Sequence, residues 1–267
     1  MIIPTMNLTQ IQYIQLDREA WCVTAQVSDL SSPVGMSNLW NDSYWLSAYP
    51  SSHIVLAELR HFEWHYHAVQ KPISKRSIAH RQRQQQRQGV RQLLQTLLNK
   101  LEINDILDES NFPYRLSQSK YYVCFSHTAA HNKDEFNKKS NQNIGPISYS
   151  KIAAVISRRR PAGIDIEHNN VAWHIIKRFY SDNEITILQT LPKNQRDYIA
   201  KLLWQIKESF IKIHQYTLAQ GLGIDYSDVI PALTDDINRD FITISHTDNQ
   251  SNHQIAVLQA DQTVVVF

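Results

Sequence analysis

The chain has 267 residues, of which 42% are hydrophobic, so it can bury a sizeable core as one large domain or two small ones. Its formal net charge is only +2, which argues against a polyanion-binding surface over the whole molecule. Two cysteines, Cys22 and Cys124, give no disulfide framework, and we find neither a basic leader at 1–15 nor an apolar run of transmembrane length. We therefore expect a cytoplasmic protein that does not contact a membrane.

The hydrophobic pattern predicts a mixture of strands and helices. Apolar runs predict strands at 21–27, 53–59, 121–125, 152–157, 162–167, 241–245, 254–259 and 263–267. Helical periodicity predicts helices at 81–101, 172–179, 183–191 and 194–214. Long helices with mostly nonlocal strands indicate an α+β fold. The polar connector at 158–161, which Pro161 closes, predicts a boundary between an N-terminal half (1–160) and a C-terminal half (161–267).

The first predicted helix carries a basic face. No Asp or Glu occurs between residues 64 and 101, whereas Arg83, Arg87 and Arg91 recur every four residues and therefore share one face. Planar guanidinium groups bind the oxygens of a phosphate monoester two at a time. The face thus suits a phosphate ligand, although a solvated basic surface and a nucleic-acid patch have the same pattern.

A polar, Asn- and Lys-rich composition at about 129–150 predicts an inserted surface loop. His127, His131 and Glu135 recur there four residues apart, as zinc ligands on a helix do. The Asn-rich context disfavours a stable helix, so we do not favour a zinc site.

The run from Gly163 to Glu167, Gly-Ile-Asp-Ile-Glu, alternates apolar residues with carboxylates. In an extended strand Asp165 and Glu167 share one face, while Ile164 and Ile166 face the core. Two hard oxygen ligands then converge, and a third carboxylate from a helix would complete a site suited to Mg²⁺.

The predicted helix at 194–214 supplies such a carboxylate. At 100° per residue its core face carries Leu203, Ile206, Phe210 and Ile213, and its opposite face carries Trp204, Glu208 and Lys212. The plainer interpretation of the second face is a solvated Glu208/Lys212 pair. Trp204 argues against it, because a large aromatic side chain on a wet face indicates a cleft.

These residues carry a resemblance to the 4′-phosphopantetheinyl transferases of the surfactin-synthetase-activating (Sfp-type) family. The segment 163–167 resembles the metal motif of that family, and Arg178-Phe-Tyr-Ser with Glu184 resembles its Arg-Phe-Phe-Ser-x-x-Glu block. The segment 204–212, Trp-x-x-Lys-Glu-Ser-x-x-Lys, resembles its second signature, at the interval expected from Glu167. Approximate matches lie at 125–128 and 112–115, and residues before about 70 match nothing we can quote.

The resemblance implies two similar α+β halves related by a pseudo-twofold axis, with coenzyme A and Mg²⁺ in the cleft between them. It implies transfer of 4′-phosphopantetheine from coenzyme A to a serine of an apo acyl or peptidyl carrier protein, by a monomer that binds no nucleic acid. Asp165 and Glu167 would hold Mg²⁺, and Glu208 would be the third ligand or the base that takes the serine proton. The loop at about 129–150 departs from the family pattern and leaves carrier docking open.

Basic and hydroxyl side chains complete the implied site. Ser126 and His127 would contact the diphosphate of coenzyme A, and Arg115 its phosphates. Arg87 and Arg91 would hold the 3′-phosphate. Lys212, and also Lys207, would bind phosphates, and Lys212 would act in catalysis with Asp165 and Glu208.

Two other functions stay open at this point. A metal-dependent phosphohydrolase would use the same carboxylates with water as the nucleophile. An RNA-binding protein would use the Arg/Gln-rich helix, although the chain lacks the aromatic ladder and glycine-rich loops common in such proteins.

Overall fold

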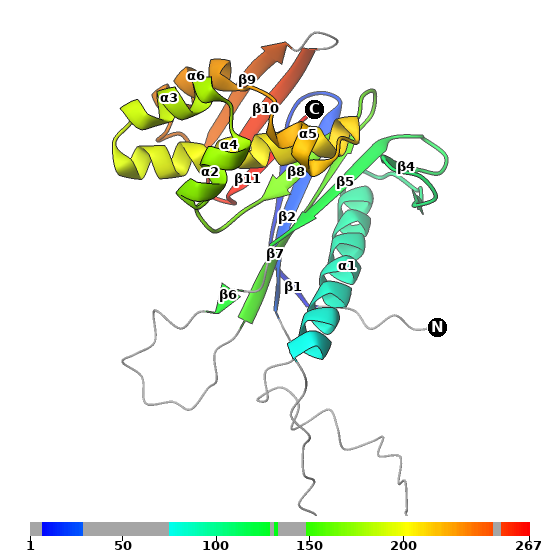
Figure 1. Ribbon diagram of the computed structural model, residues 1–267. Coiled ribbons are helices and arrows are strands. Elements are labelled where there is room, and N and C mark those ends of the chain that lie inside the picture. Colours follow the sequence, from blue (N-terminus) through cyan, green and yellow to red (C-terminus); the bar gives the residue numbers. More distant parts are fainter. Residues whose placement is uncertain (1–6, 29–74, 129–130, 133–147, 248–251) are drawn as a thin grey trace, which may run out of the picture.

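Two antiparallel sheets stack against each other, and helices cover the outer face of each (Figure 1). The computed structural model describes residues 7–28, 75–128, 131–132, 148–247 and 252–267. The predicted strand at 53–59, most of the predicted loop at 129–150 and Glu135 lie outside these residues. The combination of antiparallel sheets and helices confirms the predicted α+β class.

The larger sheet is formed by the N-terminal half and has the order β1-β2-β7-β5-β4-β3, with β6 paired to β7. Its strands are β1 (Leu8–Gln15), β2 (Ala20–Ser28), β3 (Leu107–Asp108), β4 (Tyr114–Leu116), β5 (Tyr122–His127), β6 (His131–Asn132) and β7 (Ser148–Ser157). Alternate residues of the central strand β7 face opposite sides: Ala154 and Ile156 face the helix on the outside, and Ala153 and Val155 face the second sheet.

Helix α1 (Lys75–Lys100) covers the outer face of this sheet. Its apolar stripe of Leu93, Leu94, Leu97 and Leu98 is buried, which explains why the chain is helical here. One buried polar residue on the same helix, Gln86, donates to the carbonyl oxygen of Thr128 at 2.7 Å and to Ser150 Oγ at 3.1 Å. These bonds satisfy the buried amide and fix α1 against the ends of β5 and β7.

The smaller sheet is formed by the C-terminal half and has the order β8-β11-β10-β9. Its strands are β8 (Gly163–Ile166), β9 (Phe241–Thr247), β10 (Asn252–Leu258) and β11 (Thr263–Val266). Ile164 and Ile166 of β8 pack with Val155 and Cys124 of the larger sheet, in a core shared by both halves. The free cysteines Cys22 and Cys124 are buried in this same layer.

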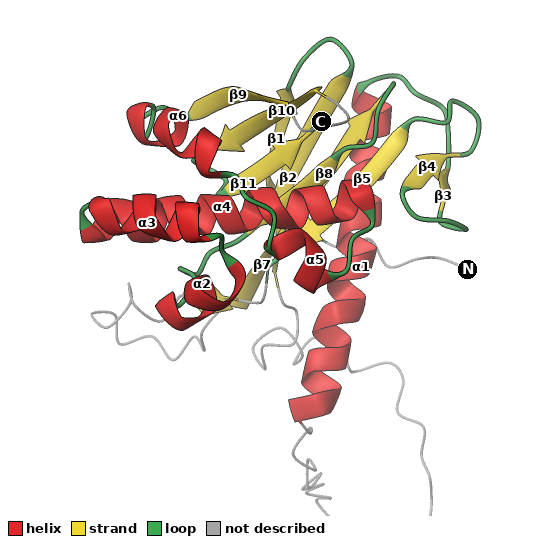
Figure 2. Ribbon diagram, turned by 45° about the horizontal axis from the view of Figure 1, so that its top comes forward, coloured by secondary structure: helices red, strands yellow, loops and turns green. Residues whose placement is uncertain are grey.

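Helix α4 (Lys193–His214) lies across the outer face of the smaller sheet (Figure 2). Around it are α2 (Trp173–Phe179), α3 (Asp182–Thr190), α5 (Leu218–Leu222), the 3₁₀ helix η1 (Ser227–Val229) and α6 (Ile230–Asp235). The predicted core face of α4 packs on this sheet, with Leu203, Ile206, Phe210 and Ile213 all buried. Further residues of α4 are buried as well, because the shorter helices cover much of its remaining surface.

The predicted helices and the predicted strands within the described residues are present, with ends that differ by a few residues. Helix α1 begins earlier than predicted, at Lys75. The pattern analysis missed β1, β3, β4, β6, α5, η1 and α6. Each sheet carries one long helix on its outer face, α1 on the larger sheet and α4 on the smaller one. The pseudo-twofold relation between the halves and the domain boundary at 160/161 stay predictions.

Candidate active site

Strand β8 and helix α4 approach each other unusually closely. A Cβ atom on Gly163 would lie 2.0 Å from the carbonyl oxygen of Ser209, so only glycine fits at this position. Gln205, buried on α4, donates to the carbonyl oxygen of Gln262 at 2.7 Å and to that of Asp165 at 3.4 Å. Together these contacts place the next two turns of α4 directly beside Asp165.

Asp165 lies at the centre of the candidate site and is only 5% exposed. Its Oδ1 accepts a hydrogen bond from Lys212 Nζ at 3.0 Å and another from Ser126 Oγ at 3.1 Å. Ser126 Oγ also accepts from the backbone N–H of Ile166 at 3.2 Å. Strand β5, strand β8 and helix α4 therefore each contribute one side chain to this contact, although they come from both halves of the chain.

Glu208 is in contact with Asp165. Burial and the negative charge of Asp165 raise the pKa of Glu208 to about 7, and the two carboxyl groups are hydrogen-bonded to each other. Trp204, one turn earlier on α4, is also hydrogen-bonded to Glu208. This contact explains why an aromatic residue lies on the face of α4 opposite its core face. Trp204, Glu208 and Lys212 on that face are all partly buried and line the site.

Lys212 forms an ion pair with Asp165 at 3.0 Å, and the charge of Glu208 also acts on it. Burial opposes the charged form of Lys212, but the charges of Asp165, Cys124 and Glu208, together with the hydrogen bond to Asp165, outweigh it and raise the pKa of Lys212. Lys212 also donates to the carbonyl oxygen of Ile164. Its ammonium group is thus held in place by β8.

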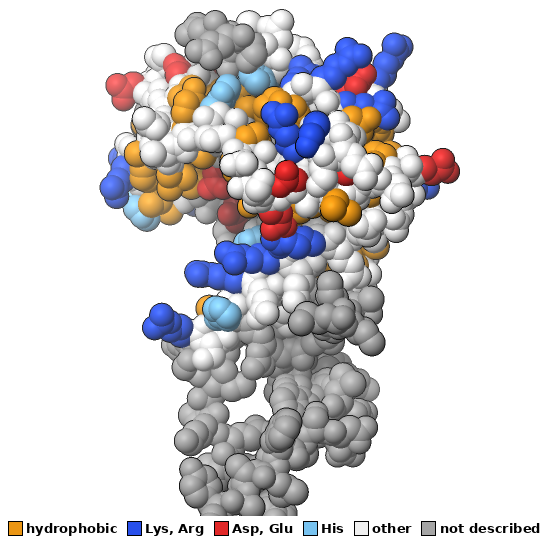
Figure 3. All heavy atoms as spheres, turned by 90° about the vertical axis from the view of Figure 1, so that its right-hand side faces the viewer, with side chains coloured by type: hydrophobic (Ala, Val, Ile, Leu, Met, Phe, Trp, Pro, Cys, Tyr) orange, Lys and Arg blue, Asp and Glu red, His pale blue; other side chains and the backbone are white. Residues whose placement is uncertain are grey.

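His127 lies at the exposed end of β5, next to Ser126. Partial burial lowers the pKa of His127, and the positive charges of Lys212 and Arg87 lower it further. The charges of Lys212, Asp165 and Arg87 thus all act on His127. On the face shown in Figure 3, Lys and Arg side chains lie close to a group of Asp and Glu side chains.

Two other predicted phosphate ligands have other partners. Arg91 binds the carboxylate of Glu109 through Nε and Nη2, each at 2.6 Å. Arg115 donates to the hydroxyl of Tyr122 at 2.8 Å, and its guanidinium lies 4.2 Å from the centre of that ring. Arg115 also borders a surface pocket with Phe112 and Pro113.

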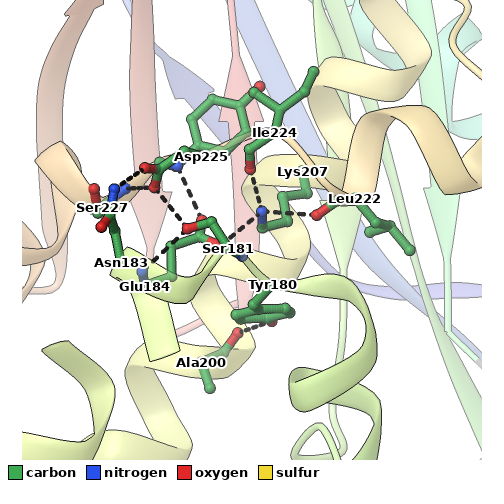
Figure 4. A network of polar contacts seen from close by, with 11 residues as sticks. Tyr180, Ser181, Asn183, Glu184, Ala200, Lys207, Leu222, Ile224, Asp225 and Ser227 are labelled. Atoms are coloured by element: carbon green, nitrogen blue, oxygen red, sulfur yellow. Dashed lines mark hydrogen bonds and ion pairs between the residues drawn. The ribbon is translucent and has the colours of Figure 1, made fainter. Parts of the chain in front are cut away.

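Lys207, another predicted phosphate ligand, lies away from the other candidate site residues, and its role in phosphate binding stays a prediction. The side chain is 0% exposed and pairs with Glu184, whose carboxylate oxygen Oε2 lies 3.0 Å from Lys207 Nζ (Figure 4). Consecutive residues on a helix point about 100° apart, so Lys207 faces α3 and the segment after α5 while Glu208 faces β8. The buried ammonium group of Lys207 therefore does not line the candidate site in this structure.

Glu167 follows the end of β8. Its Oε1 accepts from the backbone N–H of Asn169 at 2.9 Å, and its charge acts on Lys201. Among the described residues no group of three His, Cys, Asp or Glu side chains is arranged to hold a metal ion. The assignment of Glu167 to the metal therefore stays a prediction.

The chemistry of Asp165 and Glu208 nevertheless fits a divalent cation. Burial of Glu208 and the negative charge of Asp165 raise the pKa of Glu208 to about 7, and the two carboxylates repel each other when both are ionised. A cation between them removes that repulsion, and hard oxygen ligands are those that Mg²⁺ prefers.

Comparison with known protein families gives an independent result for this half. Residues 161–266 match the family model of the 4′-phosphopantetheinyl transferase superfamily, ACPS. The C-terminal half is thus similar to the domains of this superfamily of transferases. In the comparison with curated proteins, no protein matched the chain.

The matched region contains Asp165, Glu208 and Lys212, whereas Arg87, Ser126 and His127 lie before it. The Sfp-type assignment therefore remains a resemblance that rests on the motifs. No helix within the described ranges is both long and apolar enough to cross a membrane.

Sequence analysis missed the structural role of Gln205 and the pairing of Glu184 with Lys207. Gln205 and Lys207 flank Ile206, so both fall next to the predicted core face of α4. Polar residues at such positions need buried partners. That signal was present in the sequence, but it does not identify the partners.

Proposed function

We propose that the protein transfers the 4′-phosphopantetheine group of coenzyme A to a serine hydroxyl of an apo carrier protein, leaving adenosine 3′,5′-bisphosphate. The observation that carries this proposal is the contact between Asp165 and Glu208 beside the basic side chains of Lys212, His127 and Arg87. The match of residues 161–266 to the transferase superfamily supports it. The motifs of the Sfp-type family favour a carrier protein as the acceptor.

The substrate diphosphate carries negative charge that increases on the leaving phosphate as the phosphorus–oxygen bond breaks. Lys212 is held beside the carboxylates by Asp165 and the Ile164 carbonyl, and His127 lies near it at the end of β5. Cationic groups fixed in advance stabilise developing charge without having to reorganise. We assign Lys212 and His127 to the diphosphate.

Asp165 and Glu208, with Glu167 as the third carboxylate, would hold Mg²⁺. The ion would neutralise oxygens of the diphosphate when bound. Mg²⁺ keeps several water ligands in protein sites, so two or three carboxylates are a sufficient donor set.

The acceptor serine must lose its proton as it attacks phosphorus. Glu208 would take that proton on its carboxylate, because burial, the largest cause that raises its pKa, makes it a stronger base than an exposed glutamate. Trp204 and Asp165 hold the carboxyl group by hydrogen bonds. We therefore favour a dual role for Glu208, which would bind Mg²⁺ and take the proton of the acceptor serine.

The test is the mass gain of an apo carrier protein incubated with coenzyme A, Mg²⁺ and the enzyme. We expect the carrier to gain one phosphopantetheine group, and Asp165→Ala to abolish the gain while leaving the protein folded. Glu208→Gln should lower the rate by a factor on the order of a hundred. Cleavage of coenzyme A with no modified carrier in a panel of apo carriers would instead favour a phosphohydrolase, and a rise in melting temperature with RNA but not with coenzyme A would favour RNA binding.

A further inference from the structure

A buried ion pair lies on the side of α4 that faces away from the candidate site. Lys207 of α4 and Glu184 of α3 are both 0% exposed, and their charged atoms lie 3.0 Å apart. Figure 4 shows the pair within a network that joins three segments, namely the start of α3, the middle of α4 and residues 222–227. We call Lys207, Glu184 and these hydrogen-bonded segments the buried lock.

Every proton of the Lys207 ammonium has an acceptor. One goes to Glu184 Oε2, one to the carbonyl oxygen of Leu222 at 2.8 Å, and one to that of Ile224. An ammonium group has three N–H donors, so its hydrogen-bonding capacity is filled. The rings of Tyr180 and Tyr226 lie 5.1 and 5.3 Å from Nζ and provide further favourable surroundings for the charge.

Glu184 is equally well satisfied. Oε2 accepts from the backbone N–H of Ser181 at 2.8 Å, and Oε1 accepts from the backbone N–H of Tyr226 at 2.9 Å. Ser181 Oγ in return caps α3 by accepting from the backbone N–H of Glu184 at 3.1 Å. The polarity of the network is therefore fixed: carbonyl oxygens surround residue 207, and backbone N–H groups surround residue 184.

Helix α4 is held from two sides as a result. On the sheet side Gln205 and Lys212 bond to the backbone of β8, and Ser209 touches Gly163. On the opposite side the buried lock ties Lys207 to residues 222–226. Because Glu208 is the next residue along α4, a rotation of the helix about its axis would break the lock and move Glu208 away from Asp165.

We propose that Lys207 and Glu184 are positioning residues that fix the rotation of α4, and so hold Glu208 and Lys212 against β8 without touching the substrate. The inference rests on the proposed function for its catalytic consequence. It assigns Lys207 a task different from phosphate binding, and it assigns Glu184 a task in the same network.

The experiment compares Lys207→Met, Glu184→Gln and the double variant with wild type. Arg239→Met is the matched control, because Arg239 forms an exposed ion pair with Asp236 in the same half. Amide hydrogen exchange, melting temperature, the KM for coenzyme A and kcat on a carrier protein are measured for each. Glu184→Gln keeps the size of the side chain and one acceptor oxygen, which can accept from the N–H group of Ser181 or from that of Tyr226.

We expect both single variants to speed hydrogen exchange at residues 222–226 and to melt below wild type. The double variant should melt above the lower of the two singles, because neither charge is then buried without its partner. Transfer by Lys207→Met should fall about tenfold or more in kcat, since small displacements of catalytic groups are costly. The KM for coenzyme A should stay within about twofold, and Arg239→Met should behave as wild type.

Three results would overturn the proposal. One is a large rise in KM with unchanged exchange at 222–226, which would mean that Lys207 contacts a phosphate. Another is faster exchange with unchanged kcat, which would leave the lock without any effect on the site. The third is strict additivity of the two substitutions in melting temperature. If wild type itself transfers nothing, the proposed function fails, whereas exchange and melting still decide whether the lock exists.

Discussion

Asp165 has three close neighbours of different charge and chemistry: the Lys212 ammonium, the Ser126 hydroxyl and the Glu208 carboxyl group. A single lysine can neutralise only one of the two carboxylates. Burial of Glu208, together with the negative charge of Asp165, therefore raises the pKa of Glu208 to about 7. This local imbalance of charge links the stability of the protein to pH.

Glu208→Gln tests that link in protein freed of metal by a chelator. The folded pKa of about 7 lies above the ordinary value of 4.5, so the folded state binds the proton more tightly than the unfolded state does. The stability that this proton provides is present below pH 4.5 and is lost as the pH rises to about 7. Glutamine stays neutral, so the variant should melt above wild type at pH 8, with no such gain at pH 4.5.

The control for this measurement is Glu102→Gln, which changes an exposed glutamate outside the site. It should show no pH-dependent gain. Equal melting temperatures of Glu208→Gln and wild type at pH 8 would mean that Glu208 is not crowded by Asp165.

The sequence predicted the positions of individual residues where the period of a strand or helix alone decides which face of that element a side chain occupies. Alternation in β8 placed Ile164 and Ile166 in the core and Asp165 in the site, and the helical period placed Glu208 and Lys212 on one face. Lys207 could not be placed in this way. Its burial depends on Glu184 and on two carbonyl groups after α5, which the sequence of α4 does not reveal.

At the scale of elements, the site depends on how closely α4 approaches β8. Gly163→Ala should force these elements apart, because the added Cβ would lie 2.0 Å from a backbone oxygen that cannot turn away. Overpacking of this kind costs about 1–3 kcal/mol, and the transfer rate should fall with it. Denaturant unfolding and the mass-gain assay measure the two effects.

Gly223→Ala is the matched control for this substitution. Its added Cβ would lie 3.6 Å from the nearest atom, the carbonyl oxygen of Ala219, which is an ordinary contact. The backbone there is right-handed, so alanine fits without strain. If Gly163→Ala were as stable and active as Gly223→Ala, the close approach would not matter for the site.

Helix α1 offers a comparison between two arginines one turn apart. The charge of Arg87 acts on His127, whereas Arg91 is bound to Glu109 through two hydrogen bonds. We expect Arg87→Ala to weaken coenzyme A about tenfold and its 3′-dephospho analogue much less, because only the former carries the phosphate monoester. Arg91→Ala should change the affinity for either ligand by a smaller factor than the loss in coenzyme A affinity that Arg87→Ala causes.

Titration calorimetry with both ligands measures these differences. If Arg87→Ala lowered the affinity for both ligands by the same factor, α1 would not bind the 3′-phosphate. A larger loss in Arg91→Ala would mean that Arg91 exchanges Glu109 for the ligand.

The elements that the pattern analysis missed are short or exposed. Strand β1 has alternation too weak to predict, because most of its residues are exposed, and β3 and β4 contain only two and three residues. Such strands form because a neighbouring strand supplies hydrogen bonds, which is a tertiary effect. The long helices and the apolar strands carry their own signal, and the pattern analysis found them.

At the scale of the whole molecule, the two halves share one apolar layer. Side chains from β2, β5 and β7 pack there against side chains from β8, β10 and β11. The candidate site lies where β5 and β8 meet, with Ser126 from one half bound to Asp165 from the other. Composition alone allowed one domain or two, and the packing places side chains from both halves in the candidate site.

The shared layer predicts that the halves unfold together. Leu258 on β10 is 4% exposed and belongs to the layer, whereas its cross-strand partner Phe241 on β9 is 42% exposed. Leu258→Ala should lower the free energy of unfolding by about 2–5 kcal/mol and still give one transition, and Phe241→Ala should have a much smaller effect. The indole of Trp21 reports on the larger sheet and that of Trp204 on α4, so single-tryptophan variants can follow both halves. If the Trp21 transition stayed in place while the Trp204 transition shifted, the halves would be independent domains, and the predicted boundary at 160/161 would also be a boundary of stability.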